Sequence, residues 1–532
     1  MKKMIFVNLV SLIIITLILI QPVSSNIYCS QNEIIIVDNE GDGDYQTIQQ
    51  AIDNANSGDI IQIYSGIYNE KLIIQKERIT LKGIDHELGA GTDTEYPIIN
   101  GDQIGNVIEI YGKHCQITSC IIQNSGHGIF DAGIFILSNE VIISANGIVS
   151  NQYGILVNNC TENIIENNYI LSNTMDGIYL LFTEENIISN NIIRENGFQG
   201  MFMYEANKNT ITENTFSLNG KDGIHLRNTC MNNEITKNII HSNSIDGIKI
   251  MDSNVYYNNL NNNEIYSNGW NGVHIVNGQS NIISDNMIYL NLLNGIQIGN
   301  SDNNRIIRNT IQDNKEEGIV FLFSGSQNNQ IYYNNVINDN AFDGGKNIWD
   351  DGRDAGGNYW SYYKGLDVDG DGIGDTPYII EGMGNMDNTP FIDPLYPPQT
   401  PSQPRGPTIG VPGTSYTYRT TSSDNLHNKI QYGWDWNGDD VVDEWTVFYS
   451  PEEPCETSYI WNQNGTYQIK VKAMDDQGFQ SDWSQPLSIT MPKDPKNKID
   501  IIGNFIFNFC QQILYRIYAI IVADQQPNIA KY

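Results

Sequence analysis

The chain has 532 residues, more than a single hydrophobic core organises, so several domains are expected. Lys and Arg number 29 against 62 Asp and Glu, which gives a formal net charge of −33 at pH 7. A field of this sign repels phosphate backbones and acidic polysaccharides and attracts divalent cations, so nucleic acid is not expected as a partner. The seven cysteines are too few for a disulfide framework in a chain of this length.

Residues 1–25 have the pattern of a secretory signal peptide. Lys2 and Lys3 precede an apolar run from Met4 to Ile20, and small residues close the segment. An uncleaved N-terminal anchor is the alternative interpretation. Both interpretations place the rest of the chain outside the cytoplasm, so we expect a secreted or extracellular cell-surface protein.

The segment that follows contains short apolar runs typical of strands, at residues 34–37, 60–64, 72–74 and 79–82. Between the first two runs, Ile48, Ala51, Ile52 and Ala55 have the spacing of one helix face. The terminal coil of a solenoid exposes unpaired strand edges. A helix over residues 47–55 is therefore predicted to cap the open end.

From residue 154 a repeat dominates the sequence. A glycine followed by an aliphatic residue recurs every 23 to 25 residues, at Gly154, Gly177, Gly200, Gly223, Gly247, Gly272, Gly295 and Gly318. Three rows of asparagine advance with nearly the same steps. They are Asn163, Asn186, Asn209, Asn233, Asn258, Asn281, Asn304 and Asn329; Asn168, Asn191, Asn214, Asn238, Asn263, Asn286, Asn309 and Asn335; and Asn173, Asn196, Asn219, Asn243, Asn268, Asn291, Asn314 and Asn340.

These rows predict an all-β fold, a single-stranded right-handed parallel β-helix of about 23 residues per coil over residues 33–345. Coils stacked about 4.8 Å apart would superimpose the aliphatic residues that follow each glycine. Asparagine suits the turns because it tolerates left-handed backbone geometry and because its amide can bond the equivalent amide one coil away. An Asn-rich disordered tract is the alternative, but disorder would not hold aliphatic residues in register.

One face of this β-helix gathers residues suited to sugar chemistry. The outward positions include Tyr179, Phe202 and Tyr204, which are candidates for carbohydrate binding because aromatic rings pack on sugars. The candidate catalytic residues on the same face are Asp222, His225, Arg227, Asp246, Lys249 and His274. Asp222 and Asp246 would lie one coil apart, at about 4.8 Å, near the carboxylate separation of retaining glycosidases. Because Asp before Gly is also ordinary turn chemistry, a binding or structural role for this face is favoured over catalysis.

Two segments have the ligand spacing of calcium loops. In the predicted cap of the β-helix, residues 346–397, oxygen ligands fall at positions 1, 3, 5, 7 and 9, namely Asp367, Asp369, Asp371, the Ile373 carbonyl and Asp375. The Glu at position 12 of an EF-hand is missing, so a solvated turn is the alternative. A second set has the same spacing without the glycine at position 6: Asp435, Asn437, Asp439 and Asp443. Structural calcium is expected at the first loop and is open at the second.

The C-terminal part predicts a second domain. A Pro-rich stretch, residues 398–407, indicates a semi-rigid linker. Residues 408–492 alternate in short aromatic runs with frequent turns, which is typical of a small immunoglobulin-like β-sandwich. The tail, residues 493–532, has an amphipathic helical stripe with too many polar residues for a membrane span. Peripheral membrane contact and packing of a C-terminal helix on the sandwich are both open.

Several motifs carry a resemblance to known families. Residues 41–52 and 58–68, GDGDYQTIQQAI and GDIIQIYSGIY, are similar to the N-terminal start of pectate-lyase-like β-helices. The repeats, with residues 358–361 (NYWS) and 369–378 (DGDGIGDTPY), resemble NosD-like, CASH-type proteins over roughly residues 33–397. That family is named for a periplasmic factor in copper-enzyme maturation. Residues 432–436 and 465–471 resemble PKD-type immunoglobulin-like domains of surface proteins.

The sequence therefore favours an exported, calcium-stabilised β-helix protein that binds a glycan or another cell-envelope component. A polysaccharide lyase, epimerase or glycosidase acting on the outer face is the first alternative. A copper-delivery factor, which the resemblance implies, is the second, but the seven histidines are dispersed and no His/Met/Cys cluster has ligand spacing, so copper is not expected. Asn159 and Asn464 lie in sequons for N-glycosylation.

Overall fold

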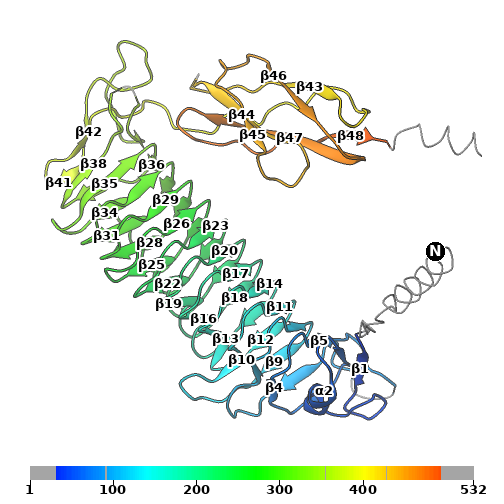
Figure 1. Cartoon of the computed structure of the whole chain (residues 1–532). Helices are drawn as coiled ribbons and strands as arrows, with labels where there is room; N and C mark the ends of the chain where they lie inside the picture. The colour runs from blue at the N-terminus through cyan, green and yellow to red at the C-terminus, as the bar shows by residue number, and fades with distance from the viewer. Residues whose placement is uncertain (1–31, 90–92, 354, 427, 493–532) are drawn as a thin grey trace, which may run out of the picture. The chain divides into compact units, whose positions relative to one another are not determined.

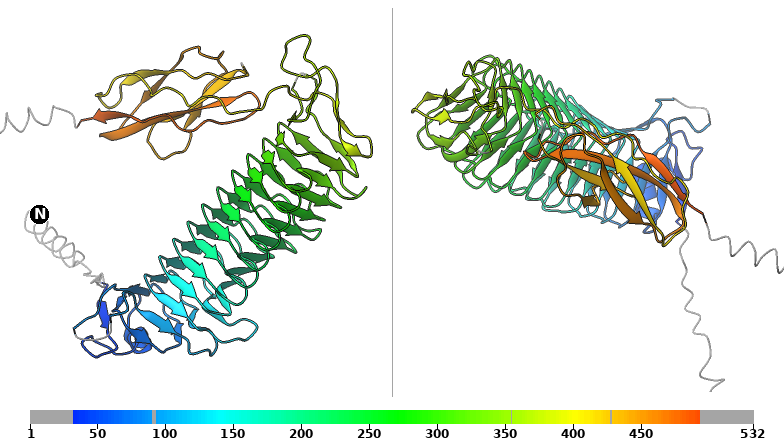
Figure 2. Two further views of the ribbon diagram at one scale, coloured as in Figure 1. Left: turned by 180° about the vertical axis from the view of Figure 1, so that it is seen from behind. Right: turned by 90° about the horizontal axis from the view of Figure 1, so that it is seen from above.

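The computed structural model describes residues 32–89, 93–353, 355–426 and 428–492. Its described residues are almost entirely strands and turns, and they fall into two compact units that divide after Val255. The strands of the β-helix stack as parallel arrows within each unit (Figures 1 and 2). The predicted parallel β-helix is confirmed. The signal segment and the C-terminal tail lie outside the described residues.

The first unit consists of coils of three strands each, which form three parallel sheets. Sheet A contains β1 (Ile34–Val37), β2 (Ile60–Ile63), β5 (Thr80–Gly83), β8 (Gln116–Thr118), β11 (Ile142–Ser144), β14 (Ile164–Glu166), β17 (Ile187–Ser189), β20 (Thr210–Thr212) and β23 (Glu234–Thr236). Sheet B contains β3 (Ile67–Tyr68), β6 (Ile98–Asn100), β9 (Ile121–Gln123), β12 (Gly147–Val149), β15 (Tyr169–Leu171), β18 (Ile192–Arg194), β21 (Thr215–Ser217) and β24 (Ile239–His241). Sheet C contains β4 (Leu72–Ile74), β7 (Ile108–Ile110), β10 (Ala132–Ile136), β13 (Tyr153–Asn158), β16 (Ile178–Leu181), β19 (Met201–Tyr204), β22 (Ile224–Arg227) and β25 (Ile248–Met251).

The helix predicted at residues 47–55 is present as α2 (Ile48–Asn54), with Thr47 as its N-cap. Its apolar face, Ile48, Ala51 and Ile52, is buried against the first strands. Further along the unit, Ile178, Met201, Ile224 and Ile248 are paired in register in sheet C, and all four are fully buried. The glycine–aliphatic rows therefore lie one above another in this unit, as the repeat predicts.

The asparagine rows form amide ladders inside the turns. Asn191 is typical: its Nδ2 donates to Asn214 Oδ1 of the next coil at 2.9 Å and to Ile165 O at 2.8 Å. Its Oδ1 accepts from both the backbone N and the Nδ2 of Asn168, each at 3.0 Å. The side chain thus satisfies buried turn backbone on both sides. The amide-ladder reason for asparagine is confirmed.

The second reason, left-handed backbone geometry, is wrong for the ladder residues. The positive φ belongs to the residue just before each ladder asparagine, for example 58° at Glu185 and 55° at Asn190. That preceding residue is exposed, so many residue types occupy it. The ladder asparagine is selected for its amide and not for its φ.

The second unit continues the same three-strand coil. Sheet A contains β26 (Asn259–Asn261), β29 (Ile282–Ser284), β32 (Arg305–Ile307), β35 (Gln327–Tyr332) and β38 (Lys346–Ile348). Sheet B contains β27 (Glu264–Tyr266), β30 (Met287–Tyr289), β33 (Thr310–Gln312), β36 (Asn335–Ile337) and β39 (Tyr359–Trp360). Sheet C contains β28 (Val273–Val276), β31 (Ile296–Gly299), β34 (Ile319–Phe321), β37 (Ala341–Asp343) and β41 (Glu381–Gly382), and a small antiparallel pair, β40 (Tyr378–Ile379) and β42 (Met386–Asp387), lies nearby in sequence.

The three amide ladders of this unit end on buried carboxylates. Asn347 Nδ2 donates to Asp343 Oδ1 at 2.8 Å, Asn314 Nδ2 to Asp339 Oδ2 at 2.9 Å, and the Asn358 backbone N to Asp387 Oδ2 at 2.8 Å. Each ladder amide presents its NH₂ toward the next coil, so the last rung must be an acceptor. A carboxylate, which only accepts when ionised, ends the ladder without leaving a donor unused.

The predicted rows fail at this end by one residue. The sequence rows continue through Asn335 and Asn340, whereas the ladder residues are Asn334 and Asp339. The two additional residues of the 25-residue coil before them precede Asn329, and the spacing of five between ladder positions then continues to 334 and 339. The asparagines at 335 and 340 therefore lie one place too far along the chain. Asn335 instead exchanges two hydrogen bonds with the backbone of Leu395, at 2.7 and 2.8 Å.

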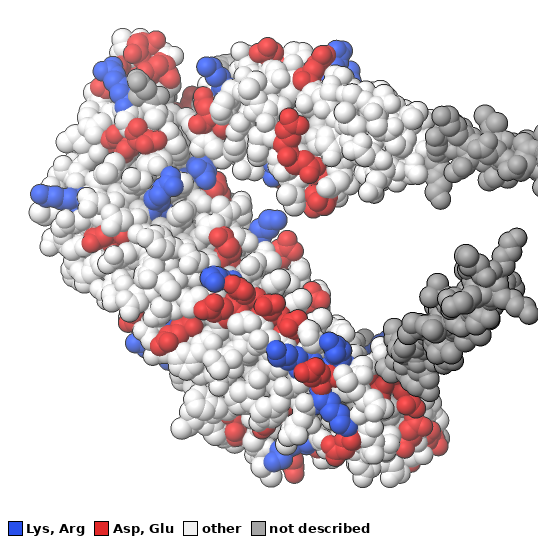
Figure 3. Space-filling view, viewed as in Figure 1, with Lys and Arg blue, Asp and Glu red and all other residues white. Residues whose placement is uncertain are grey.

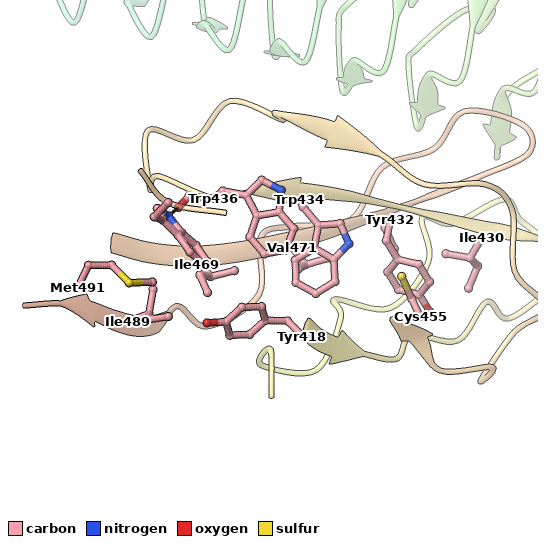
Figure 4. Close-up of a cluster of buried hydrophobic side chains, with 12 residues drawn as sticks. Tyr418, Ile430, Tyr432, Trp434, Trp436, Cys455, Ile469, Val471, Ile489 and Met491 are labelled. Atoms are coloured by element: carbon pink, nitrogen blue, oxygen red, sulfur yellow. Dashed lines mark hydrogen bonds between the residues drawn. The ribbon is translucent and has the colours of Figure 1, made fainter. Parts of the chain in front are cut away.

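The predicted β-sandwich is present. The short alternating runs at 416–418, 430–436, 445–449, 467–473 and 487–490 predict five of its strands, and the strand at 455–460 is an addition. One sheet pairs β43 (Ser415–Thr420) with β46 (Cys455–Ile460), and the other runs β45 (Glu444–Trp445), β44 (Ile430–Asp435), β47 (Gly465–Asp475) and β48 (Leu487–Met491), all antiparallel. Buried aromatic and aliphatic side chains lie between them (Figure 4). Trp434 and Trp436 stack with ring centroids 4.6 Å apart.

Candidate functional site

The outer face of sheet C in the first unit carries the sequence-predicted residues. Tyr179, Phe202, His225 and Lys249 are paired in register on β16, β19, β22 and β25. They point outward because their strand neighbours are fully buried and side chains alternate along a strand. The predicted outward row is therefore real across these four coils.

An aromatic ladder occupies the N-terminal part of this face. Ring centroids lie 5.8 Å apart between Tyr153 and Tyr179, and 5.1 Å apart between Tyr179 and Phe202. Phe202 also contacts Tyr204 in the second row, at 6.5 Å, and the His225 ring edge-on at 5.4 Å. Burial raises the pKa of Tyr179 to about 12, so its phenol stays neutral and the ladder is an uncharged platform.

The acids that precede the glycines each serve two purposes. Asp222 Oδ1 accepts the backbone N of Asp246 at 3.0 Å, which ties its turn to that of the next coil. The remaining oxygens lie beside basic side chains on the face: Asp222 Oδ2 lies 3.1 Å from His225 Nδ1, and Asp246 Oδ2 lies 3.3 Å from Lys249 Nζ. Both acids are at most 2% exposed. They support turns and orient neighbours more directly than they present carboxylates to solvent.

His225 has one ring nitrogen without a partner. Asp222 lies at Nδ1, whereas Nε2 is enclosed and has no hydrogen-bond partner among the described residues. A carboxylate at Nδ1 stabilises the tautomer with the proton on that nitrogen, which leaves Nε2 as a base. The arrangement could accept a proton after a small movement that opens Nε2.

One of the six predicted catalytic residues turns away from this group. Arg227 lies at the far end of β22, where its Nε pairs with Asp252 Oδ2 at 3.1 Å, and it is largely exposed. His274 belongs to the second unit, where Gln297 Nε2 lies 3.1 Å from His274 Nε2. The structure therefore brings together Asp222, His225, Asp246 and Lys249.

Sequence reasoning missed a further acid on the face. Asp176 is 4% exposed, and its Oδ1 accepts the backbone N of Gln199 at 2.9 Å. Burial raises its pKa to about 7, against the lowering effects of that hydrogen bond and of Lys221. Lys221 itself lies over the ring of Phe198, with its Nζ 3.9 Å from the centroid. The signal was present, since Asp176 precedes a repeat glycine in the same row as Asp222.

The first predicted calcium loop has the geometry of a compact turn around one acid. Asp367 Oδ2 accepts the backbone N of Gly372 at 2.9 Å, and this hydrogen bond lowers its pKa. The ligand oxygens of Asp367, Asp369 and Asp371 lie within 4.8 Å of one another. The neighbouring charge of Asp371 raises the pKa of Asp369, which indicates uncompensated negative charge. Asp375 is held differently, because its Oδ2 accepts the Val368 backbone N.

The second loop has the same backbone form but an internal cation. Asp435 accepts the backbone N of Gly438 and of Asp440, and Asp440 adopts the positive φ of 64° that a glycine would take there. Lys470 Nζ lies 3.9 Å from Asp435 Oδ2 and also pairs with Asp440. The other two predicted ligands on this loop, Asn437 and Asp439, hydrogen-bond each other, and Asp443 accepts the Trp436 backbone N. A lysine therefore supplies positive charge where a calcium ion would.

The described residues do not fit copper. Copper favours imidazole, thiolate and thioether donors. Within the described ranges, the one group of three His, Cys, Asp or Glu side chains close enough to share an ion is the all-oxygen set of Asp367, Asp369 and Asp371. Burial raises the pKa of Cys120 to about 12 and that of Cys230 to about 11, so these thiols stay protonated. We derive no step through copper.

Two surface features complete the description. The predicted glycosylation acceptors Asn159 and Asn464 are both exposed. In the part of the chain that the structure describes, no helix has the length and apolarity needed to cross a membrane.

Stacked three-strand coils with an inward asparagine ladder define a parallel β-helix of the pectate-lyase-like class. Within that class, the family model described as "Periplasmic copper-binding protein (NosD)" matches residues 52–264 and 219–365. These matches cover more than half of the chain, so the chain belongs to the NosD family. The family's periplasmic description points to an exported protein. Among curated proteins, none matches the chain.

Solved structures similar to the chain include polysaccharide-modifying enzymes. The A-module of the mannuronan C-5 epimerase AlgE6 from Azotobacter vinelandii is 16% identical, with a TM-score of 0.47 over 57% of this chain and 92% of that one. The DFA-IIIase from Arthrobacter chlorophenolicus A6, without its lid, is 10% identical, with a TM-score of 0.41 over 54% and 86%. A PKD domain of an M14-like peptidase from Thermoplasmatales archaeon SCGC AB-540-F20 is 37% identical, with a TM-score of 0.17 over 18% and 97%.

Proposed function

We propose that the chain is an exported glycan-binding protein whose sheet C face receives an extended, uncharged polysaccharide. The observation that carries this proposal is the aromatic surface of Tyr179 and Phe202, which are paired in register on adjacent coils, with the buried ring of Tyr153 packed against Tyr179. Aromatic rings with one polar edge suit sugars, which have apolar C–H faces and polar rims. The regular coil spacing offers the same contact to successive units of a chain-like ligand.

Charge supports a neutral ligand. The acids and cations beside the ladder are already paired, Asp222 with His225 and Asp246 with Lys249. On the face seen in Figure 3, the few Lys and Arg stand among Asp and Glu, with wide uncharged areas between them. A net charge of −33 would repel an acidic polymer at long range. A neutral glycan is not repelled by the net charge and does not need a free charged side chain as a partner.

The test is glycan binding by the full chain and by two variants. In a panel of neutral and acidic polysaccharides, the Phe202→Ala variant should bind its neutral ligand about tenfold more weakly than the parent, because one stacked ring is lost. Tyr169→Ala is the matched control, since Tyr169 is an outward, exposed tyrosine on sheet B of the same unit. Equal loss in both variants, or binding that Phe202→Ala leaves unchanged, would overturn the proposal.

A second candidate function is modification of the bound polysaccharide. The observation that favours it is His225, oriented by Asp222 and with Nε2 left without a partner. The low exposure of Asp222 and Asp246 favours binding over this alternative, and Asp222 already accepts the Asp246 backbone N in the turn. Screening for unsaturated or reducing-end products decides between them: a product that disappears in the Asp222→Asn, Asp246→Asn double variant would establish catalysis, and no product would exclude it.

A further inference from the structure

A buried carboxyl pair lies at the N-terminal end of the first unit, away from the glycan-binding face. Asp38 follows β1 and is fully buried. Its Oδ2 accepts the backbone N of Gly41 and of Asp42, each at 2.8 Å, which closes the turn after β1. Its Oδ1 is enclosed and has no hydrogen-bond partner among the described residues. One oxygen of a fully buried carboxylate is therefore left uncompensated.

Glu87, which follows β5, contacts the Asp38 carboxyl group. Both of its carboxylate oxygens are enclosed, and neither accepts a hydrogen bond from the described part of the chain. Burial raises the pKa of Glu87, and so do the charge of Asp38 and a carboxyl–carboxyl contact with it. Glu40 and Asp93 add further negative charge. Two acids thus approach each other inside a negative field.

The described surroundings supply no countercharge. Neither Asp38 nor Glu87 forms an ion pair with a described Lys, Arg or His; nearby His86 pairs with the exposed Asp85. The Tyr68 hydroxyl, which lies close to both acids, donates to the Tyr64 carbonyl at 2.9 Å and so leaves them without its proton. Asn39 Oδ1, beside Asp38 in the chain, is also enclosed without a donor.

Two enclosed carboxylates in contact are stable only if they share a proton or bind a cation. The unpartnered atoms of the two acids are all carboxylate oxygens: Asp38 Oδ1 and both oxygens of Glu87. This is a hard donor set of carboxylate oxygens, which Ca²⁺ prefers and soft metals do not. An exported, strongly acidic protein also concentrates divalent cations at its surface.

We infer that Asp38 and Glu87 bind a divalent cation, with Ca²⁺ the best fit, at the N-terminal end of the β-helix. The ion joins the turn after β1 to the segment after β5, two stretches that already touch. Their closeness is visible at Gly89, where an added Cβ would lie 2.0 Å from Asp42 Oδ2. Bound there, the ion holds the loops that cover the first coil beside α2, and it acts independently of the glycan-binding face.

The experiment isolates this site from the C-terminal loop. The parent for the test is the full chain with Asp369→Asn and Asp371→Asn, which removes carboxylates from the other predicted site. Calcium is titrated into the chelator-treated protein by calorimetry, and melting temperature is measured with and without Ca²⁺. One equivalent of Ca²⁺ should bind and raise the melting temperature by a few degrees, because a ligand that binds only the folded state stabilises it.

Variants identify the ligands. Glu87→Gln in the same parent should lose both the bound equivalent and the rise in melting temperature, and Asp38→Asn should do the same. Glu40→Gln is the control, since it removes a neighbouring charge from an exposed residue and should keep both. No Ca²⁺ binding in the parent, or binding that Glu87→Gln retains, overturns the inference. Glu87→Gln that raises the melting temperature at pH 8 without any bound ion would instead show a shared proton.

Discussion

The carboxylate that ends the middle ladder should make the protein more stable in mild acid. Asp387 Oδ2 accepts the Asn358 backbone N at 2.8 Å and the Trp360 indole Nε1 at 2.9 Å, and its Oδ1 accepts the Thr389 backbone N at 3.1 Å. Despite these hydrogen bonds, burial raises its pKa to about 7. The cost of burying the charge therefore exceeds the gain from the donors.

Because burial raises the pKa of Asp387, the free energy of unfolding should fall as the pH rises. The pKa of Asp387 is higher in the folded than in the unfolded chain, so its stabilising contribution is complete below the unfolded value and is lost as pH rises to about 7. One pKa unit corresponds to about 1.4 kcal/mol, and pH 5 to pH 7 spans about two units. The free energy of unfolding should therefore fall by about 2 to 3 kcal/mol from pH 5 to pH 8 through this residue alone.

Asp387→Asn removes the titration and keeps one acceptor oxygen. The asparagine NH₂ would face the Thr389 backbone N, and loss of that hydrogen bond costs about 1 kcal/mol. The variant should accordingly be less stable than wild type at pH 5 and more stable at pH 8. Chemical unfolding followed by tryptophan fluorescence at both pH values measures the crossover, because Trp360 contacts the carboxylate directly.

The control is Asp393→Asn, at an exposed aspartate six residues away, which should leave the pH dependence as in wild type. If Asp387→Asn shows the same slope of stability against pH as wild type, the carboxylate is not the group that titrates. The reasoning from burial at the ladder end would then be refuted.

Three further predictions concern the ladders, the calcium loop and the glycines. Asn191→Ala leaves several buried groups of adjacent coils unpaired at about 1–3 kcal/mol each, so it should lower the free energy of unfolding by about 3 kcal/mol or more. The control is Asn190→Gly, at the exposed neighbouring residue, which should cost less than about 1 kcal/mol. Equal losses in the two variants, measured by chemical unfolding, would contradict the ladder account. A chelator should lower the melting temperature of the wild-type chain, and it should lower that of Asp369→Asn by less. A wild-type melting temperature that the chelator leaves unchanged would contradict stabilisation by bound calcium. Gly200→Ala should lower the melting temperature because the added Cβ would lie 2.7 Å from a backbone oxygen. In Gly147→Ala the nearest atom to the added Cβ is 3.7 Å away, so this variant should have near wild-type stability. A lower melting temperature for Gly147→Ala than for Gly200→Ala would contradict the packing described.

The repeat made the fold predictable because one physical requirement recurs in every coil. An inward aliphatic residue after a glycine and an inward amide at each turn fix both the strand face and the coil length. The row was misplaced at Asn335 because asparagine occupies both 334 and 335, and only the spacing of five residues from Asn329 identifies 334 as the ladder position. The missed strand β46 has a similar cause, since its alternating residues are half-exposed and mostly polar.

The candidate site was less predictable than the fold. Rows on a coil tell which residues share a face, so the presence of Asp222 and His225 on one face and the row of Tyr179 and Phe202 followed from spacing. The rows do not determine which acidic side chain a flexible Lys or Arg pairs with. Arg227 turned to Asp252 for that reason. The unpaired oxygens of Asp38 and Glu87 left no trace in the sequence, because the two residues lie on separate coils outside the regular repeat.

The carboxylates at the ends of the three ladders also affect whether two molecules can associate end to end. An amide at the last rung would offer its NH₂ to any similar stack that arrived end-on, and two molecules could then join as one rod. Each ladder instead ends on a buried aspartate, so an arriving molecule finds no open row of amides to extend.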